Sequence, residues 1–319
     1  MTQRIKTTRR VFATGVAAAI GGAATGTWQS FGAETVHAAQ VDGRPSKRTT
    51  AFLRRPDAAI YYEVTGSGPA IVFAHGAGGN HLSWWQQIPY FSPRFTCVTF
   101  SHRTFAPSTE AANGPGPAAF VEDLAALIDH LRLADVVLVA QSLGGRACLP
   151  YAIQNPSRVR ALVMASTLGG VDYSTIRHPE VGREAVWARE AERTQAQMKQ
   201  DGVIPGGGIR MAKEQPALLY LYSQINDLTD VARKQARAAT QASVPPPSIE
   251  AVKQLSAPVL FITGAEDAAI FPGASVALAS IMRNARVESV PRAAHSVYFQ
   301  RPDTFNRLVD SFLRSLKIE

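Results

Sequence analysis

Cysteine and long apolar runs are scarce in this chain of 319 residues. Its two cysteines, Cys97 and Cys148, are too few for the disulfide framework that stabilises many small secreted proteins. We predict that both are small, buried, apolar side chains, with a Cys97–Cys148 disulfide as the less favoured alternative. A membrane-spanning helix needs about 18 or more consecutive apolar residues, and no stretch of the sequence has them. We therefore expect no integral membrane segment in the mature chain.

Blocks of one charge are missing as well. The net charge is +8, but residues 1–39 carry four basic side chains against one acidic side chain, so this short segment accounts for +3 of that net charge. The remaining positive charges are spread along the chain without a lysine- or arginine-rich block, which argues against nucleic-acid binding. No group of His, Cys, Asp and Glu has metal-ligand spacing, and no glycine-rich loop is typical of phosphate binding. We therefore predict no metal and no cofactor.

The N-terminal segment has the features of an export signal. Paired arginines precede a weakly hydrophobic run rich in alanine and glycine, and a small-residue cleavage site lies near residues 36–38. The string TRRVF at residues 8–12 resembles a twin-arginine signal, which directs folded proteins across a bacterial inner membrane. This predicts a signal peptide over residues 1–39, the twin-arginine export machinery as a partner, and a periplasmic or secreted mature protein. A disordered basic tail or a short anchor is the alternative.

Short apolar runs predict a series of strands in the remainder of the chain. Two of them, AIVFA (70–74) and VVLVA (136–140), are continuous runs typical of strands that are covered on both faces. Apolar residues with helical spacing lie between them, as over residues 117–131. Alternating strands and helices predict an α/β fold with a mostly parallel central sheet and helices on both faces. Further strands are predicted at residues 58–66, 95–100, 161–165, 258–264 and 285–291.

Residues from about 168 to 245 interrupt this alternation. They contain helical patterns at residues 183–200 and 228–240, a glycine-rich break at residues 202–208, and no convincing strand. We interpret this segment as a helical lid inserted into a single domain that spans residues 40–319.

One serine stands at the junction of a predicted strand and a predicted helix. The strand at 136–140 is followed by Gln141, Ser142 and Leu143 and then by two glycines. A nucleophilic serine must be exposed at a sharp strand-to-helix turn, and small neighbours relieve the crowding there, as in the G-x-S-x-G motif. Ala140 takes the place of the first glycine. A serine that only caps an ordinary strand-to-helix loop is the alternative.

A base and an acid follow in the C-terminal part of the chain. A serine nucleophile needs a histidine to take its proton and an acid to orient that histidine. His295 and Asp267 each follow a predicted strand. Because Ser142 does so too, we expect the three side chains to meet at the carboxyl edge of the sheet. Glu266 and Asp172 are the alternatives for the acid.

The order Ser142, Asp267, His295 and its setting resemble the α/β-hydrolase superfamily, in its branch with a helical lid. The resemblance covers residues 52–315 and includes a His-Gly pair at residues 75–76, directly after a strand. It implies an α/β-hydrolase domain in which Ser142 is the nucleophile, His295 the base and Asp267 the acid.

The resemblance implies further site residues. The backbone N–H groups of Ala77 and Leu143 are expected to form the oxyanion hole, with His75 holding the loop of Ala77. The two glycines that relatives usually carry in the loop after the fourth-position strand are absent from residues 101–108, so we expect this loop to differ in shape. The residues predicted to line the substrate pocket are Gly78, Trp84, Phe105 and Gln141.

The function that these residues predict is that of a serine hydrolase. Its substrate is expected to be a carboxylic ester or lactone of a small to medium apolar molecule, cleaved through an acyl-enzyme. A carbon–carbon bond hydrolase of dienone or diketone type and a cofactor-free haloperoxidase or perhydrolase are alternatives with the same triad. A haloalkane dehalogenase or epoxide hydrolase is disfavoured, because an aspartate would stand at position 142. A ligand-binding receptor on the same fold is the non-enzyme alternative.

Overall fold

The structure is a computed structural model, and it describes residues 47–177, 180–241 and 244–319. The predicted signal peptide at residues 1–39 lies outside the described residues, so the signal and the export of the protein stay predictions. Within the described part of the chain, no helix combines the length and the apolar character that crossing a membrane requires.

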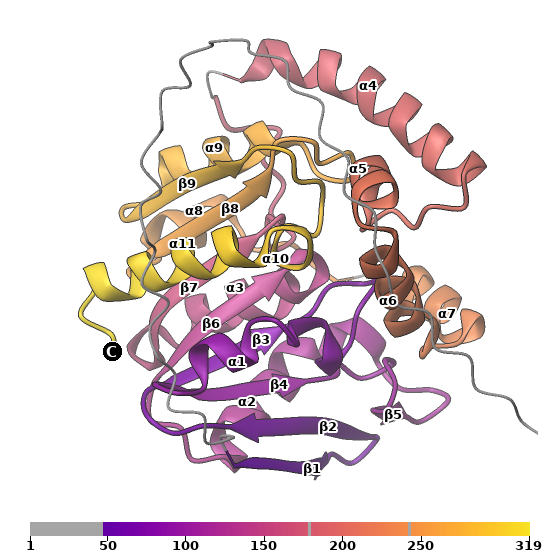
Figure 1. Cartoon of the computed structure of the whole chain (residues 1–319). Coiled ribbons are helices and arrows are strands. Elements are labelled where there is room, and N and C mark those ends of the chain that lie inside the picture. Colours follow the sequence, from indigo (N-terminus) through magenta and orange to yellow (C-terminus); the bar gives the residue numbers. More distant parts are fainter. Residues whose placement is uncertain (1–46, 178–179, 242–243) are drawn as a thin grey trace, which may run out of the picture. The chain divides into compact units, whose positions relative to one another are not determined.

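Nine strands of the described residues form one sheet (Figure 1). They are β1 (Arg48–Arg54), β2 (Ala58–Thr65), β3 (Ala70–Ala74), β4 (Thr96–Phe100), β5 (Thr109–Glu110), β6 (Val136–Gln141), β7 (Val159–Ala165), β8 (Val259–Gly264) and β9 (Ala285–Val290). Their order is β1-β2-β4-β3-β6-β7-β8-β9, with β5 paired to β2. Strand β2 is antiparallel to β1, β4 and β5, whereas all neighbours from β4 to β9 are parallel. The predicted, mostly parallel sheet is therefore confirmed.

The two faces of the sheet enter two separate hydrophobic cores. Successive side chains of a strand point to opposite faces, so Val136, Leu138 and Ala140 of β6 lie in one core. Val137 and Val139 lie in the other. Both faces are buried, which explains why such strands read as continuous apolar runs.

Helices cover both cores. The helices that pack on the core of Leu138 are α2 (Phe120–His130), α3 (Gly145–Gln154), α8 (Ile249–Gln254) and α9 (Pro272–Ile281). Those that pack on the core of Val139 include α1 (Ile88–Phe91), α10 (Val297–Gln300) and α11 (Pro302–Ser315). Figure 1 shows α11 in front of the sheet and α3 behind it. The two layers of helices leave the carboxyl edge of the parallel strands for other elements to cover.

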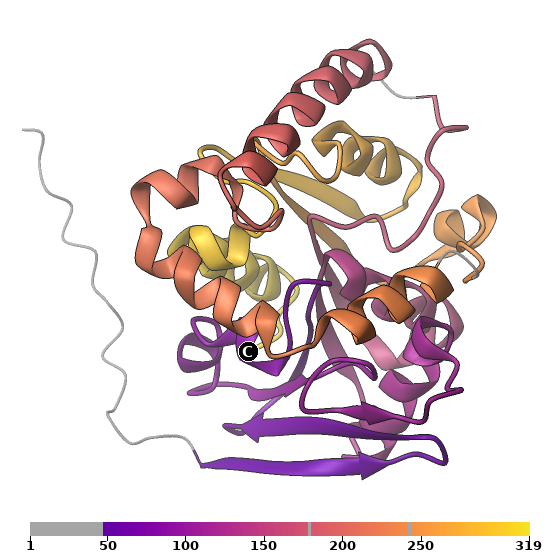
Figure 2. The same ribbon diagram turned by 90° about the vertical axis from the view of Figure 1, so that its right-hand side faces the viewer.

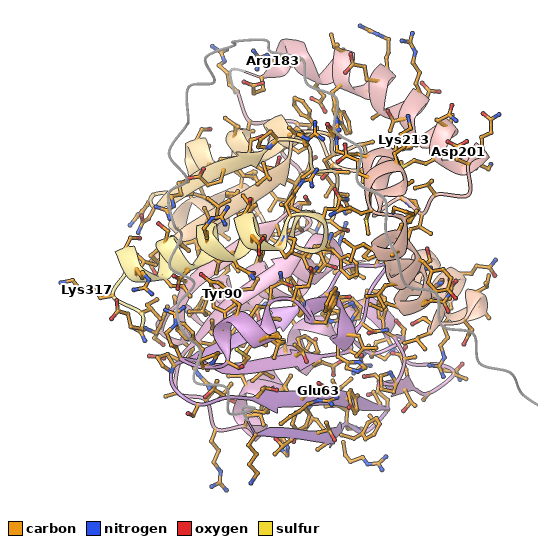
Figure 3. All side chains as sticks on the ribbon, viewed as in Figure 1. Glu63, Tyr90, Arg183, Asp201, Lys213 and Lys317 are labelled. Atoms are coloured by element: carbon orange, nitrogen blue, oxygen red, sulfur yellow. The ribbon has the colours of Figure 1, made fainter. Side chains whose placement is uncertain are left out.

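Four further helices lie between β7 and β8 in the described residues. They are α4 (Val181–Gln200), α5 (Gly208–Glu214), α6 (Pro216–Asp227) and α7 (Val231–Gln241), and we call residues 180–241 the helical insert. The insert lies on the side to which the carboxyl ends of β8 and β9 point (Figures 1 and 2). Arg183 and Asp201 mark the two ends of α4 in Figure 3, and both are exposed. The helical character predicted for this segment is thus present, and its role as a lid stays a prediction.

The two cysteines lie on opposite faces of the sheet. Cys97 in β4 belongs to the core of Val139, and Cys148 in α3 belongs to the core of Leu138. Both are buried and free, and burial raises the pKa of both thiols. The alternative of a Cys97–Cys148 disulfide is therefore wrong, because the sheet separates the two side chains.

The loop after β4 is held by a buried arginine. The guanidinium of Arg103 contacts carboxylate oxygens of Asp57 at 2.8 Å, Glu110 at 3.1 Å and Asp123 at 2.6 Å. A buried charge is tolerated only when it is paired in this way. This cluster keeps a defined conformation in a loop without the glycines that relatives usually have.

Candidate active site

Ser142 lies at a sharp turn between β6 and α3. Its φ angle is 47°, in the left-handed region that residues other than glycine rarely adopt. Helix α3 also comes very close to the sheet here, since a Cβ atom at Gly144 would lie 2.2 Å from the carbonyl oxygen of Ala74 in β3. The turn therefore has the strand-to-helix geometry that the sequence around residue 142 predicts.

Thr167, just after β7, supports this turn from the side. Its hydroxyl donates to the carbonyl oxygen of Ser142 at 2.5 Å and accepts from the N–H of Gly169 at 3.2 Å. Thr167 is buried, so the two hydrogen bonds are shielded from water. Sequence reasoning missed this residue, because a single threonine after a strand carries no distinctive signal.

His295 and Asp267 come into contact at the ends of β9 and β8. The Nδ1 atom of His295 lies 2.9 Å and 3.1 Å from the two carboxylate oxygens of Asp267. Asp267 also accepts hydrogen bonds from the backbone N–H groups of Ala269 at 2.8 Å and Ile270 at 3.0 Å. Asp267 is 3% exposed and His295 9% exposed. With Nδ1 directed at the carboxylate, Nε2 is the ring nitrogen left for proton transfer.

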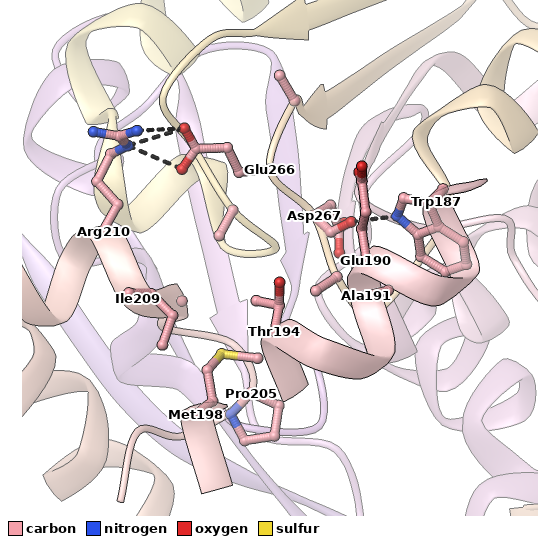
Figure 4. Close-up of a pocket in the computed structure, with 14 residues that line it drawn as sticks. Trp187, Glu190, Ala191, Thr194, Met198, Pro205, Ile209, Arg210, Glu266 and Asp267 are labelled. Carbon is pink, nitrogen blue, oxygen red and sulfur yellow. Dashed lines mark hydrogen bonds and ion pairs between the residues drawn. The ribbon is translucent and has the colours of Figure 1, made fainter. Parts of the chain in front are cut away.

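The two alternative acids lie elsewhere. Glu266 forms an ion pair with Arg210 of the helical insert at 2.6 Å (Figure 4). Asp172 is exposed, and its carboxylate accepts a hydrogen bond from the N–H of Ser174 at 2.9 Å. Of the three candidate acids, Asp267 is the one that the structure places against His295.

Ser142 and His295 line one cavity of about 270 Å³, which we call the first cavity. Three other residues of the predicted site also line it, namely Ala77, Gly78 and Gln141. The helical insert contributes Ile204, Pro205, Gly206, Tyr222 and Asn226. The nucleophile candidate and the base candidate therefore line one cavity that the insert helps to form.

A second cavity, also of about 270 Å³, shares Ala77 and Ser142 with the first. The other residues that line it include Leu143, Arg146, Thr167, Leu168 and Ile270. Ser142 thus lies where two cavities meet, and the predicted oxyanion-hole residues Ala77 and Leu143 lie beside it.

Tyr222 connects the helical insert to the site. Its side chain is buried, and its hydroxyl accepts a hydrogen bond from the hydroxyl of Ser296 at 3.0 Å. A Cβ atom at Gly78 would lie 3.1 Å from the same tyrosine hydroxyl. Burial raises the pKa of Tyr222, so the phenol is neutral at physiological pH. Sequence reasoning did not assign it to the site, because its apolar neighbours in α6 are typical of ordinary helix packing.

A second link joins the insert to the loop of His295. The side-chain oxygen of Gln300 accepts from the N–H of Ala294 at 2.8 Å, and its amide nitrogen donates to the carbonyl oxygen of Gly207 at 2.6 Å. Gln300 is 2% exposed. One buried amide therefore holds both the residue before His295 and a loop of the insert.

Helix α4 is hydrogen-bonded to the loop that carries Asp267. The indole N–H of Trp187 donates to the carbonyl oxygen of Asp267 at 2.7 Å (Figure 4). The side-chain amide of Gln195 donates to the carbonyl oxygen of Ala268. Trp187 also lines a further cavity of about 430 Å³ between α4 and this loop. The helical insert therefore contacts the loops of both Asp267 and His295.

Two of the predicted pocket residues lie in the core instead. Trp84 is fully buried, with its ring centroid 5.2 Å from that of Phe73 and 4.5 Å from that of Tyr298. Phe105 is also buried, and its ring packs on that of His75 at 4.6 Å. Neither residue lines the first or the second cavity. Large aromatic side chains are stabilised strongly by burial, and the neighbouring cores accommodate both of them.

His75 has the structural role that the sequence favours. Its Nδ1 atom lies 2.8 Å from the carbonyl oxygen of Gly76, and its Nε2 atom accepts from the backbone N–H of His102 at 3.0 Å. The ring thereby joins the loop of Ala77 to the loop after β4. Among the described residues, no group of three or more His, Cys, Asp and Glu side chains could hold a metal ion.

Comparison with known proteins agrees with this architecture. The sequence profile of the family described as alpha/beta hydrolase fold matches residues 69–302. Over 272 residues the chain is 28% identical to a putative non-heme bromoperoxidase of Mycobacterium tuberculosis, covering 81% of this chain and 98% of that protein. It is 24% identical over 278 residues to 3-oxoadipate enol-lactonase 2 of Acinetobacter baylyi, covering 82% and 96%.

A solved structure, the enol-lactonase from Burkholderia xenovorans LB400, matches with a TM-score of 0.65 and 21% identity, covering 83% of this chain and 100% of that one. The fold, the sheet order and the long profile match all lead to one assignment. The chain belongs to the α/β-hydrolase fold family.

Proposed function

We propose that the protein is a serine hydrolase that cleaves carboxylic esters or lactones. One observation carries the proposal: Ser142, on a left-handed turn, shares a cavity with His295, whose Nδ1 lies 2.9 Å from the buried carboxylate of Asp267. A histidine oriented by a carboxylate activates a serine hydroxyl for attack on an acyl carbon, and the shared cavity is where the two side chains would act on one substrate. The relatives named as enol-lactonases also support hydrolysis of an ester or lactone.

In the proposed acylation step, Ser142 Oγ attacks the acyl carbon while its proton passes to His295 Nε2. Asp267 holds the Nδ1–H tautomer of His295 and stabilises the imidazolium that forms. Collapse of the tetrahedral intermediate breaks the bond between the acyl carbon and the leaving oxygen. His295 gives its proton to that oxygen, so an alcohol leaves, or a lactone ring opens.

The second step releases the acid. His295 takes a proton from a water molecule as the water oxygen attacks the acyl carbon of the acyl-enzyme. The new tetrahedral intermediate collapses, the bond to Ser142 Oγ breaks, and His295 returns the proton to that oxygen. The free enzyme and a carboxylic acid result.

The oxyanion is assigned to backbone N–H groups. Leu143 follows Ser142 in the short 3₁₀ turn Ser142–Gly144 that leads into α3, and the first N–H groups of a helix lack partners within the helix. Ala77 supplies the second N–H from the loop after β3, and it lines both cavities. Each donor is expected to contribute about 2.7–4 kcal/mol to stabilisation of the transition state.

Labelling with a fluorophosphonate tests the nucleophile. We expect the wild-type protein to react, and Ser142→Ala to lose both the label and ester or lactone hydrolysis, by a factor on the order of 10⁴ to 10⁶. The substrates are p-nitrophenyl esters of increasing acyl length and simple lactones, followed by spectrophotometry and pH-stat titration.

Ser166 provides a matched control for this test. It follows the neighbouring strand β7, is 1% exposed and has a φ of 45°, so it shares the backbone conformation of Ser142. It lines neither the first nor the second cavity, and Ser166→Ala should label normally. Equal labelling of Ser142→Ala and wild type, or a wild-type protein that does not react, would reject the serine nucleophile and favour a ligand-binding role.

A second candidate is a perhydrolase reaction, which the relative named as a putative bromoperoxidase favours. Hydrogen peroxide would then attack the acyl-enzyme in place of water, releasing a peracid and restoring the Ser142 hydroxyl. The peracid would oxidise bromide to hypobromous acid and be reduced to the carboxylic acid. Bromination that depends on acetate, peroxide and Ser142, and that is faster than ester hydrolysis, would make this the main activity.

A further inference from the structure

We propose that the second cavity binds a carboxylate of the substrate through Arg146, on the acyl side of the bond that is cleaved. The preferred substrate is then a monoester of a short dicarboxylic acid. This inference rests on the proposed serine hydrolase function and adds the charge and the orientation of its substrate.

Arg146 reaches the site from helix α3. It lies four residues after Ser142, in the first turn of α3, and lines the second cavity together with Ser142 and Leu143. Its aliphatic part packs near Gly170, where a Cβ atom would lie 3.5 Å from Arg146 Cγ and 3.3 Å from its Nη1. The side chain is half-buried, so its charge is only partly solvated.

The positive charge of Arg146 is not paired with an acid in the part of the chain that the structure describes. Ion pairs of the described residues engage other arginines, such as Arg103 and Arg158, and none of them involves Arg146. Arg146 is also the one charged residue among the described residues that line the second cavity. A guanidinium that faces a cavity without an acid beside it is suited to an anion that enters with the substrate.

The N-terminus of helix α3 adds to the positive electrostatic potential that Arg146 creates in the second cavity. The N-terminus of a helix carries partial positive charge, so a cation in the first turn is unfavourable and an anion is favourable. The first turn of α3 contains Arg146 and no acidic residue. A substrate carboxylate in the second cavity would therefore gain from the guanidinium and from the helix terminus together.

The place of His295 decides which part of the substrate carries the charge. His295 must give its proton to the leaving oxygen, and it lines the first cavity but not the second. The leaving alcohol is thus assigned to the first cavity, whose other lining residues are all uncharged side chains. The acyl chain, with its carboxylate, is assigned to the second cavity.

The spacing of the residues limits the length of the acyl chain. Ser142 and Arg146 are only four residues apart in sequence, and both line the second cavity of about 270 Å³. A carboxylate that contacts the guanidinium while the acyl carbon contacts Ser142 Oγ then needs a short spacer. For a cavity of this size we expect roughly two to four methylene groups, which corresponds to succinate, glutarate and adipate monoesters.

Three ethyl or acetyl esters separate the possibilities in a pH-stat assay. Monoethyl glutarate carries a carboxylate on the acyl side, 4-acetoxybutanoate carries it on the alcohol side, and the ethyl ester of glutaric acid monoamide is an uncharged isostere of the first. We expect the wild-type protein to prefer monoethyl glutarate over the uncharged isostere by roughly 10- to 100-fold in kcat/KM. This preference is measured on the wild-type protein alone, by comparing its kcat/KM values for the three esters.

Variants assign that preference to Arg146. Arg146→Met keeps most of the aliphatic contact and should reduce the ratio of kcat/KM for monoethyl glutarate to kcat/KM for the uncharged isostere to about one. Arg146→Lys keeps a positive charge and should retain part of the preference. Arg54→Met changes an exposed arginine of β1 in the same way and should leave the ratio unchanged. Fluorophosphonate labelling of each variant reports whether the turn at Ser142 is intact.

The outcomes distinguish this inference from the function on which it rests. A protein that neither labels nor cleaves any of the three esters would reject the proposed function. A protein that labels and cleaves the uncharged ester without preferring monoethyl glutarate would overturn the carboxylate site alone. So would an Arg146→Met variant that loses the same factor on all three substrates, which would indicate general electrostatic stabilisation. Preference for 4-acetoxybutanoate would reverse the assignment of the two cavities and overturn the acyl-side proposal.

Discussion

Ser142 and the Asp267–His295 pair are held by different parts of the molecule. The turn of Ser142 is fixed from the sheet, by the close approach of Gly144 to Ala74 in β3 and by the hydroxyl of Thr167 after β7. The loops of Asp267 and His295 also follow strands, but they are hydrogen-bonded in addition to the helical insert. The position of the proposed nucleophile is thus set by the central fold, while the proposed acid and base lie in loops that an inserted segment also contacts.

The difference has an energetic basis. The sheet next to Ser142 is covered on both faces, so any movement of β6 would open two cores at once. Helix α4 contacts the Asp267 loop through hydrogen bonds of single side chains, those of Trp187 and Gln195, and one such bond contributes only about 0.5–1.5 kcal/mol. We therefore expect that a hydrogen bond on the side of the proposed acid and base can be removed without unfolding the protein.

The largest expected effect tests the acid directly. Asp267→Asn preserves the shape of the side chain but no longer stabilises the imidazolium or its correct tautomer, and we expect kcat/KM to fall by roughly 10⁴-fold. Asp172→Asn, at the exposed alternative acid, should stay within about twofold of wild type, as expected for a surface change. Near-normal ester turnover in Asp267→Asn would show that the contact with His295 is structural and that another group orients the base.

The second-largest expected effect tests how the sheet holds the turn of Ser142. Thr167→Val removes the donor to the Ser142 carbonyl and the acceptor for the N–H of Gly169. We expect the free energy of unfolding to fall by about 1–2 kcal/mol and kcat to fall with it, by roughly tenfold. Denaturant unfolding and ester kinetics measure the two quantities. Thr167→Ser keeps the hydroxyl and should restore both, and unchanged stability and rate in Thr167→Val would remove the support that we assign to this residue.

The smallest expected effect tests how the helical insert holds the loop of Asp267. Trp187→Phe removes the indole N–H that donates to the Asp267 carbonyl and keeps an aromatic ring to pack on Phe271. We expect kcat to fall by roughly fivefold, from the loss of one hydrogen bond, with KM and the melting temperature close to wild type. Steady-state kinetics and thermal unfolding separate this positioning role from a structural one.

Arg210→Gln is the matched control on the insert. It breaks a contact to the same loop, the ion pair with Glu266, but this pair is partly exposed and surface pairs contribute little. We expect less than about a twofold change in kcat. If Trp187→Phe lowered stability as much as Thr167→Val, the contrast between the two sides of the site would not hold.

The fold was predictable where the physics is local. Continuous apolar runs identified the central strands, such as those at 70–74 and 136–140, because both faces of these strands are buried. Strand β1 was missed, since it is an edge strand in which Leu53 is the one buried residue and therefore has no apolar periodicity. Its existence depends on pairing with β2, which is a tertiary property.

The residues of the site likewise fall into those that the sequence predicts and those that it does not. Ser142, Asp267 and His295 could be proposed from sequence because their chemistry demands particular residue types at strand ends. Thr167 and Trp187 act through backbone carbonyl oxygens, and many residue types at many positions can donate to a carbonyl. Such supporting residues therefore cannot be recognised from the sequence. The burial of Trp84 and Phe105 could not be recognised either, so both were predicted to line the pocket although they lie in the core.

The left-handed backbone at Ser142 bears on how this protein can be inactivated. Any side chain with a Cβ atom at position 142 meets the same unfavourable φ of 47°, so alanine inherits the conformational penalty of serine and removes only the hydroxyl. Glycine would relieve that penalty and could raise the thermal resistance of an inactive variant above that of the active enzyme. A comparison based on alanine therefore isolates the chemistry, whereas one based on glycine would mix the loss of reactivity with a relaxation of the main chain.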